Sequence, residues 1–128
     1  MTDRELLKIA LSMTERAYAP FSGFCVGAAL LTRDGRVFTG VNIENSSLGA
    51  TICAERTAFV KAISEGAREF EAVAVVSGEG AVWPCGICRQ FMKEFCGDDF
   101  RIITGDEDGP LQVMTMAEIL PGGFRLER

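Results

Sequence analysis

The chain has 128 residues, of which 48% are hydrophobic and 24% are charged. This length suits a single domain over residues 1–128, and the apolar content excludes a disordered chain. The longest apolar run, Phe24 to Leu31, is too short to cross a membrane, and the charged N-terminus lacks a secretory hydrophobic stretch. We therefore expect a cytoplasmic protein with no membrane partner.

Eighteen acidic residues outnumber thirteen basic ones, which gives a formal net charge of −5, and histidine is absent. An acidic surface repels phosphate backbones, so the charge argues against nucleic acid as a partner. The lack of histidine excludes Ser-His-Asp and Cys-His catalysis and every histidine metal ligand. Proton transfer near pH 7 must then fall to a carboxylate, cysteine, lysine or tyrosine with a shifted pKa.

The first predicted element is a helix over residues 2–17, which opens with a capping box of Thr2 and Glu5 and continues with apolar residues at helical spacing. A hairpin follows. Its two strands, 24–33 and 36–43, are rich in Val, Leu, Phe and Ile, and the Asp-Gly pair between them is a strong turn signal.

Helices and strands alternate through the rest of the chain. The predicted elements are a helix at 54–63, a strand at 72–76, a helix from 85 to 97, strands at 100–104 and 111–114, and a short helix at 115–120. An opening hairpin followed by alternating helices and strands predicts an α/β fold. We expect a three-layer α-β-α arrangement around a mixed sheet of about five strands.

The five cysteines are an odd number, which argues against a disulfide framework and for metal-binding or reactive thiols. Cys85 and Cys88 form a Cys-x-x-Cys pair at the start of a predicted helix, and Cys53 stands at the head of another. Structural zinc takes four protein ligands, whereas catalytic zinc takes three and leaves a position for water. Cys25 or Cys96 is in principle a fourth ligand, and a redox pair is the alternative for the Cys-x-x-Cys motif.

Glu55 lies two residues after Cys53, too close to bind the same ion comfortably but near enough to reach a water on it. There it can take a proton from that water and pass it to a leaving group. Arg56 can offset the negative charge of three thiolates by donating hydrogen bonds to them. The alternative for Glu55 is a surface charge that compensates the helix dipole.

At residues 53–56 (Cys-Ala-Glu-Arg) and 84–90 (Pro-Cys-Gly-Ile-Cys-Arg-Gln) the sequence resembles the cytidine deaminase family, small zinc nucleoside deaminases with three cysteine ligands. The resemblance extends over nearly the whole chain. Residues 17–29 are similar to the family's opening segment, residues 34–35 and 40–45 to its hairpin and ribose-binding strand end, and residues 120–124 to its C-terminal tail.

The resemblance implies an activity and a metal. Cys53, Cys85 and Cys88 would bind one Zn²⁺ ion per subunit, with Glu55 as the proton shuttle. The reaction would be the hydrolytic deamination of cytidine and 2′-deoxycytidine to uridine and 2′-deoxyuridine with release of ammonia, a step of pyrimidine salvage.

The resemblance also implies how a nucleoside would be held. Asn42 and Glu44 would hydrogen-bond the ribose hydroxyls, Phe24 would wall the pyrimidine pocket, and the backbone N–H of Ala54 would serve the base. Phe124, in the tail, would reach into the site of a neighbouring subunit, which implies a homotetramer with shared active sites.

One position departs from the family. Leu48 stands where a tyrosine is usual, which removes a ring and a hydroxyl near the pocket or the subunit contact. Three other functions stay open: deamination of a nucleoside analogue or a free base, a zinc-stabilised binding module without catalysis, and polynucleotide editing. Glu44 argues against the free base, because its carboxylate would lack a ribose partner.

Overall fold

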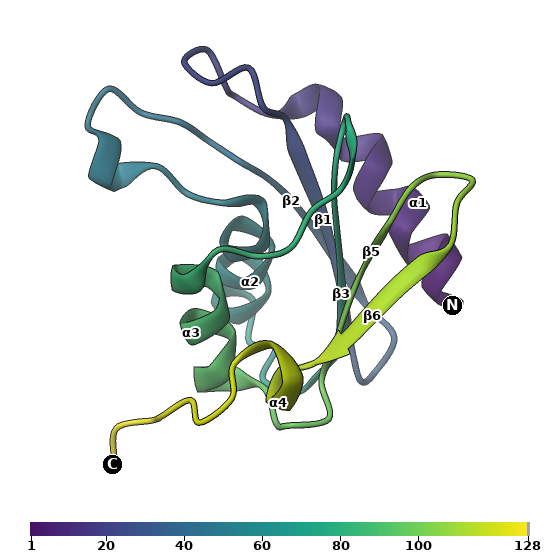
Figure 1. The fold of residues 1–128 in the computed structure, drawn as a ribbon. Helices are drawn as coiled ribbons and strands as arrows, with labels where there is room; N and C mark the ends of the chain where they lie inside the picture. Colours follow the sequence, from purple (N-terminus) through teal and green to yellow (C-terminus); the bar gives the residue numbers. More distant parts are fainter. Residues whose placement is uncertain (128) are drawn as a thin grey trace.

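A mixed β-sheet separates two helical layers in the computed structural model, which describes residues 1–127 (Figure 1). Within these residues the sheet has six strands in the order β2-β1-β3-β5-β6, with β4 paired to β3. They are β1 (Val26–Thr32), β2 (Val37–Val41), β3 (Phe70–Ser77), β4 (Gly80–Ala81), β5 (Arg101–Gly105) and β6 (Leu111–Thr115). The pair β3–β5 is parallel and the other pairs are antiparallel.

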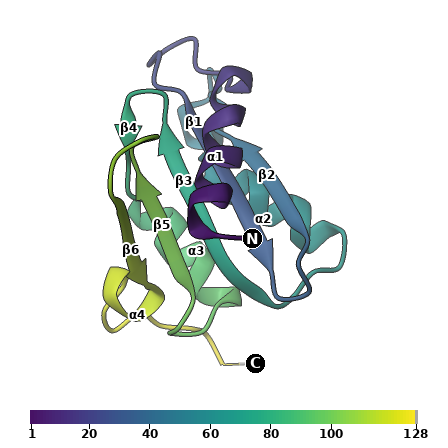
Figure 2. The same ribbon diagram turned by 90° about the vertical axis from the view of Figure 1, so that its right-hand side faces the viewer.

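Helix α1 (Asp3–Met13) lies across one face of the sheet, and α2 (Ala54–Ser64) and α3 (Gly86–Phe95) cover the other (Figure 2). A short helix, α4 (Met116–Ile119), follows β6. The three-layer α/β fold is therefore confirmed, with six strands in place of about five. No helix of the described chain has both the length and the apolar character to span a membrane.

Most boundaries lie within a few residues of the predicted ones, and the first helix differs for a physical reason. The predicted helix over 2–17 is α1 followed by a 3-10 turn, η1 (Thr14–Arg16), because the capping box fixes the start whereas the last turn tightens. A second 3-10 turn, η2 (Leu48–Ala50), and strand β4 were not predicted. Elements of two or three residues are too short to show a hydrophobic period.

The sheet carries an apolar core on each face. Between the sheet and α2 and α3, Phe59 packs at 5.1 Å from Phe70 and 6.0 Å from Phe100, measured between ring centroids. Between the sheet and α1, Leu6 and Leu7 are buried against β1 and β3. Each such side chain contributes roughly 1.5–3 kcal/mol when fully buried, so both helical layers are firmly attached to the sheet.

Helix α2 rests directly on strand β2 at Gly40. A Cβ atom at this position would lie 2.4 Å from the carbonyl oxygen of Ala54 and 2.5 Å from the amide nitrogen of Ala58. Both contacts are backbone atoms of α2, which cannot move aside like a flexible side chain. Only glycine therefore lets the first turns of α2 lie so close to the sheet.

The substitution Gly40→Ala tests this contact. The added methyl group must push α2 away from β2, so we expect the free energy of unfolding to fall by about 1–3 kcal/mol. Gly78→Ala is the matched control, because a Cβ there meets no atom within 4 Å. Urea denaturation followed by circular dichroism measures both, and equal stabilities would contradict the close packing.

Candidate metal centre and adjoining cavity

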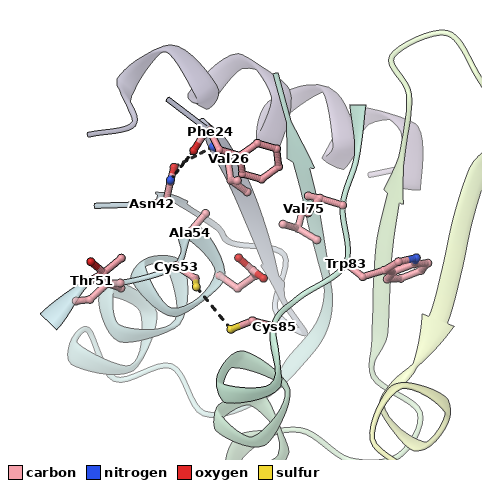
Figure 3. A pocket seen from close by; sticks show the side chains of 12 residues that line it. Phe24, Val26, Asn42, Thr51, Cys53, Ala54, Val75, Trp83 and Cys85 are labelled. Carbon is pink, nitrogen blue, oxygen red and sulfur yellow. Dashed lines mark hydrogen bonds between the residues drawn. The ribbon is translucent and has the colours of Figure 1, made fainter. Parts of the chain in front are cut away.

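Helices α2 and α3 both begin with a cysteine. Cys53 and Cys85 are their N-cap residues, each with extended backbone and without a side-chain capping hydrogen bond. An N-cap position is usually filled by Ser, Thr, Asp or Asn, whose oxygen accepts from the first helical turn. The sulphurs of Cys53 and Cys85 do not cap their helices but face each other, with their Sγ atoms 3.7 Å apart (Figure 3).

Cys88 joins this pair from the first turn of α3. It is the third helical residue after the N-cap Cys85, and the side chains of these two positions meet, as they do in a capping box. The Sγ atoms of Cys53, Cys85 and Cys88 all lie within 4.8 Å of one another. The starts of α2 and α3 thus bring together Cys53 and Cys88, which are 35 positions apart in the chain.

The three sulphurs fit a zinc ion. Zinc–sulphur bonds of about 2.3 Å in a tetrahedral site place two sulphurs about 3.8 Å apart, close to the separation of Cys53 and Cys85. Among residues 1–127, Cys25 and Cys96 do not belong to this group. Cys96 is buried at the far end of α3. With three protein ligands, the arrangement is that of a catalytic site with one open position.

Arg56 supplies positive charge to the sulphurs. It occupies in α2 the position that Cys88 occupies in α3, and its Nη2 atom donates to Cys53 Sγ at 3.5 Å. Its Nε atom is buried and has no hydrogen-bond partner among the described residues. A buried guanidinium needs nearby negative charge, which metal-bound thiolates provide.

The thiols also affect one another. The hydrogen bond with Cys88, together with Arg56, lowers the pKa of Cys53 to about 5. The pKa of Cys88 is raised, because its thiol donates to the Cys53 thiolate. One of the two sulphurs is therefore already charged at neutral pH before any metal arrives, which favours capture of a cation.

Glu55 lies in the first turn of α2 between Cys53 and Arg56 and is only 4% exposed. Burial raises the pKa of its carboxyl group to about 7. A carboxyl group with a pKa near the working pH can both accept and release a proton, which is what a general acid and base must do.

A cavity of about 200 Å³ adjoins the sulphurs (Figure 3). Its volume is below the roughly 300–1,000 Å³ of pockets for drug-sized ligands and suits a small flat ring. Its walls are mainly apolar, and Glu55 lines it together with two of the clustered cysteines. The lining residues are Phe24, Val26, Asn42, Thr51, Ile52, Cys53, Ala54, Glu55, Val75, Val82, Trp83 and Cys85.

Of the residues expected to contact a substrate, Phe24, Asn42 and Ala54 line the cavity and Glu44 does not. Asn42 Oδ1 accepts from the Val26 amide at 2.9 Å, and its Nδ2 donates to the Phe24 carbonyl at 2.8 Å. The carboxylate of Glu44 accepts from the Phe21 amide at 2.9 Å and also from the backbone and hydroxyl of Ser22. Glu44 thereby fixes the loop before β1.

Phe124 stands apart from the cavity of its own chain. Its side chain is 62% exposed, and the tail that carries it runs away from the sheet beyond α4 (Figure 1). Gln90 Nε2 donates to the Phe124 carbonyl at 2.9 Å, which ties the tail to α3.

Several lining residues were not predicted from the sequence. Val75 lies on β3, while Val82 and Trp83 follow β4. An apolar side chain in a strand or loop has no chemical signature, so only the topology reveals that it faces the cavity.

Comparison with known proteins identifies related chains. Residues 1–104 match the family described as "Cytidine and deoxycytidylate deaminase zinc-binding region". A cytidine deaminase of Halalkalibacterium halodurans is 51% identical over 127 residues, covering 98% of this chain and 96% of that protein. One from Sporosarcina psychrophila is 47% identical, covering 99% and 94%. The crystal structure of cytidine deaminase from Burkholderia pseudomallei superposes with a TM-score of 0.91 at 44% identity, covering 97% of this chain and 100% of that one.

Metal analysis tests the centre. We expect the purified protein to hold one zinc ion per chain and the Cys88→Ala variant to lose it, because two thiolates cannot complete the site. Cys96→Ala is the matched control, since it removes a buried cysteine from the other end of the same helix and should retain the metal. Equal zinc contents in the two variants, measured by mass spectrometry of the elements, would refute the ligand assignment.

Proposed function

Because the chain belongs to the cytidine and deoxycytidylate deaminase family, we propose that it is a zinc-dependent hydrolase of cytidine and 2′-deoxycytidine. The products are uridine or 2′-deoxyuridine and ammonia. The observation that carries this proposal is the meeting of three cysteine sulphurs beside the buried carboxyl group of Glu55, at the polar end of a small apolar cavity.

Cys53, Cys85 and Cys88 hold the zinc ion in this proposal. When bound, zinc lowers the pKa of a water molecule toward 7, so that the water can attack C4 of the pyrimidine. Arg56 keeps the thiolates partly neutralised through its contact with Cys53. This matters because three thiolates leave the centre with a net charge of −1, which would oppose deprotonation of the water.

Glu55 moves the protons. It accepts one from the attacking water and delivers a proton to N3 of the ring, which makes C4 electrophilic. It then takes the second proton, from the new hydroxyl group at C4, and gives it to the amino group, so that the C4–N bond breaks, the C4 carbonyl forms and ammonia leaves. The side chain is almost wholly shielded from solvent, and its protons therefore pass to the substrate rather than to bulk water.

The cavity walls orient the nucleoside. Phe24 forms an apolar side of the base pocket, and the backbone N–H of Ala54, at the start of α2, donates to the base. Asn42 and Glu44 take the ribose hydroxyls. Their present contacts leave room for this, since an ionised carboxylate offers about four lone-pair sites and an amide oxygen offers two.

The tail supports an assembly with shared sites. Phe124 and Leu126 are exposed apolar side chains on it, and Ile87 at the start of α3 is exposed as well. Large apolar side chains left exposed to solvent are often buried in subunit contacts. We propose a homotetramer in which Phe124 completes the site of a neighbouring copy. Free nucleosides as substrates place the enzyme in pyrimidine salvage in the cytoplasm, and the net charge of −5 opposes polynucleotide substrates.

Glu55→Gln tests the catalytic role. The amide keeps the shape of the side chain but cannot carry protons, so we expect kcat for cytidine to fall about 10³-fold or more with zinc content unchanged. Glu65→Gln, an exposed position at the end of the same helix, is the matched control and should retain full activity. An ultraviolet assay of deamination measures both variants.

Two outcomes of this assay would count against the proposal. A zinc-stabilised binding module predicts no turnover in the unaltered protein and no effect of Glu55→Gln. A panel of cytidine, 2′-deoxycytidine, cytosine and blasticidin-type nucleosides tests the substrate class, and activity on cytosine alone would overturn the nucleoside assignment.

Native mass spectrometry tests the assembly. We expect the mass of four 13.9 kDa chains, and we expect Phe124→Ala to raise KM for cytidine without loss of zinc, because the residue serves a neighbouring site. A fully active monomer would disprove shared sites.

A further inference from the structure

The segment between β4 and α3 carries part of the site but belongs to no regular element. Val82, Trp83 and Cys85 line the cavity, and Cys85 is one of the three clustered cysteines. Residues 82–85 lie outside the described strands and helices, and Pro84 has no amide hydrogen to donate. Other contacts must therefore fix the backbone of this segment.

Side chains from the end of β5 supply these contacts. The amide of Val82 donates to Thr104 Oγ1 at 2.9 Å, and the amide of Ala81 donates to Asp106 Oδ1 at 3.3 Å. Thr104 is completely buried, so water cannot replace its hydroxyl as the acceptor. From the other side, Arg89 Nε donates to the Pro84 carbonyl at 2.8 Å.

The loop that carries Asp106 is itself anchored. Arg4 on α1 donates to the carbonyl oxygens of Asp106 at 3.2 Å, of Glu107 at 3.0 Å and of Gly109 at 2.7 Å. These hydrogen bonds attach the loop to α1. Asp106, which accepts from the Ala81 amide, is therefore held in a fixed position.

We propose that Thr104 is a positioning residue of the deaminase site, whose hydroxyl holds the Val82 amide and thereby sets the cavity wall and the place of Cys85. Thr104 is neither a lining residue of the cavity nor part of the cysteine cluster. It acts through the three residues that separate Val82 from the helix start. The ring of Trp83 points away from the two labelled sulphurs and packs on the core, which adds a second attachment (Figure 3).

Thr104→Val keeps the shape of the side chain and removes the acceptor, which leaves the half-buried Val82 amide without its hydrogen bond to Thr104. The segment should then shift toward a position where the amide can be solvated. We expect zinc affinity to weaken about 10-fold, the size usual for loss of a group that supports a ligand. Since the effect on substrate rests on the proposed function, we also expect KM for cytidine to rise about 10-fold with a smaller fall in kcat.

The readouts are transfer of zinc from the purified holoenzyme to a colorimetric chelator and steady-state kinetics with cytidine. Thr104→Ser retains the hydroxyl and should restore both values to within about twofold. Thr32→Val is the matched control, because Thr32 is also a buried strand residue whose hydroxyl accepts a backbone amide, that of Arg36 at 2.9 Å, in the β1–β2 hairpin. It should leave zinc affinity and KM unchanged.

Unchanged zinc affinity in Thr104→Val, or an equal loss in Thr32→Val, overturns the proposal, because a general loss of stability would then explain the effect. Should Thr104→Val fail to fold, Asp106→Ala on the surface loop tests the same segment through Ala81, and it must also weaken zinc binding. A native protein that binds zinc but never deaminates cytidine would refute the proposed function, while the zinc affinities would still decide the role of Thr104.

Discussion

The site depends on one constraint: helices α2 and α3 must begin next to each other. Cys53 and Cys85 cap α2 and α3, and their sulphurs lie 3.7 Å apart because the two helix starts lie side by side. The close approach of α2 to β2 at Gly40 sets one of these starts. The other follows from the segment after β4, which hydrogen bonds from β5 hold in place. A shift of either helix by one ångström would spoil the tetrahedral spacing of the sulphurs.

The same arrangement solves a problem of charge. Three thiolates and a carboxyl group close together repel one another, and histidine is not available as a neutral ligand. The partial positive charge of two helix N-termini stabilises the sulphurs, and Arg56 adds a full positive charge at the position where the first turn of α2 reaches back to its cap. Glu55, one residue earlier, faces the cavity instead and has the raised pKa of a buried acid. Of these two adjacent residues, Arg56 stabilises the negative charge of the sulphurs, whereas Glu55 is a buried acid whose raised pKa favours its neutral form.

Much of this could be predicted from the sequence, since helical spacing, turn residues and cysteine spacing are local signals. The α/β layers, the hairpin and the pairing of Cys85 with Cys88 follow from them, whereas the grouping of Cys53 with this pair comes from the resemblance to a family. The short strand β4 and the contribution of Val75 and Val82 to the cavity could not, because they depend on which strands pair. The contact of Glu44 with the loop before β1 also depends on tertiary structure, because Phe21 and Ser22 are more than 20 residues away in the chain.

The clustered cysteines and the walls of the adjoining cavity come from different parts of the fold. The cysteines and Glu55 lie at helix starts, whereas Phe24, Asn42 and Thr51, which line the cavity, lie in loops outside the described helices and strands (Figure 3). Leu48, where the family usually has tyrosine, lies on one of these loops and is 78% exposed. Among the described residues, Leu48 belongs neither to the cavity lining nor to the cysteine cluster. Such a loop can therefore change in sequence, and with it the contacts to substrate or to another subunit, while the metal centre keeps its geometry.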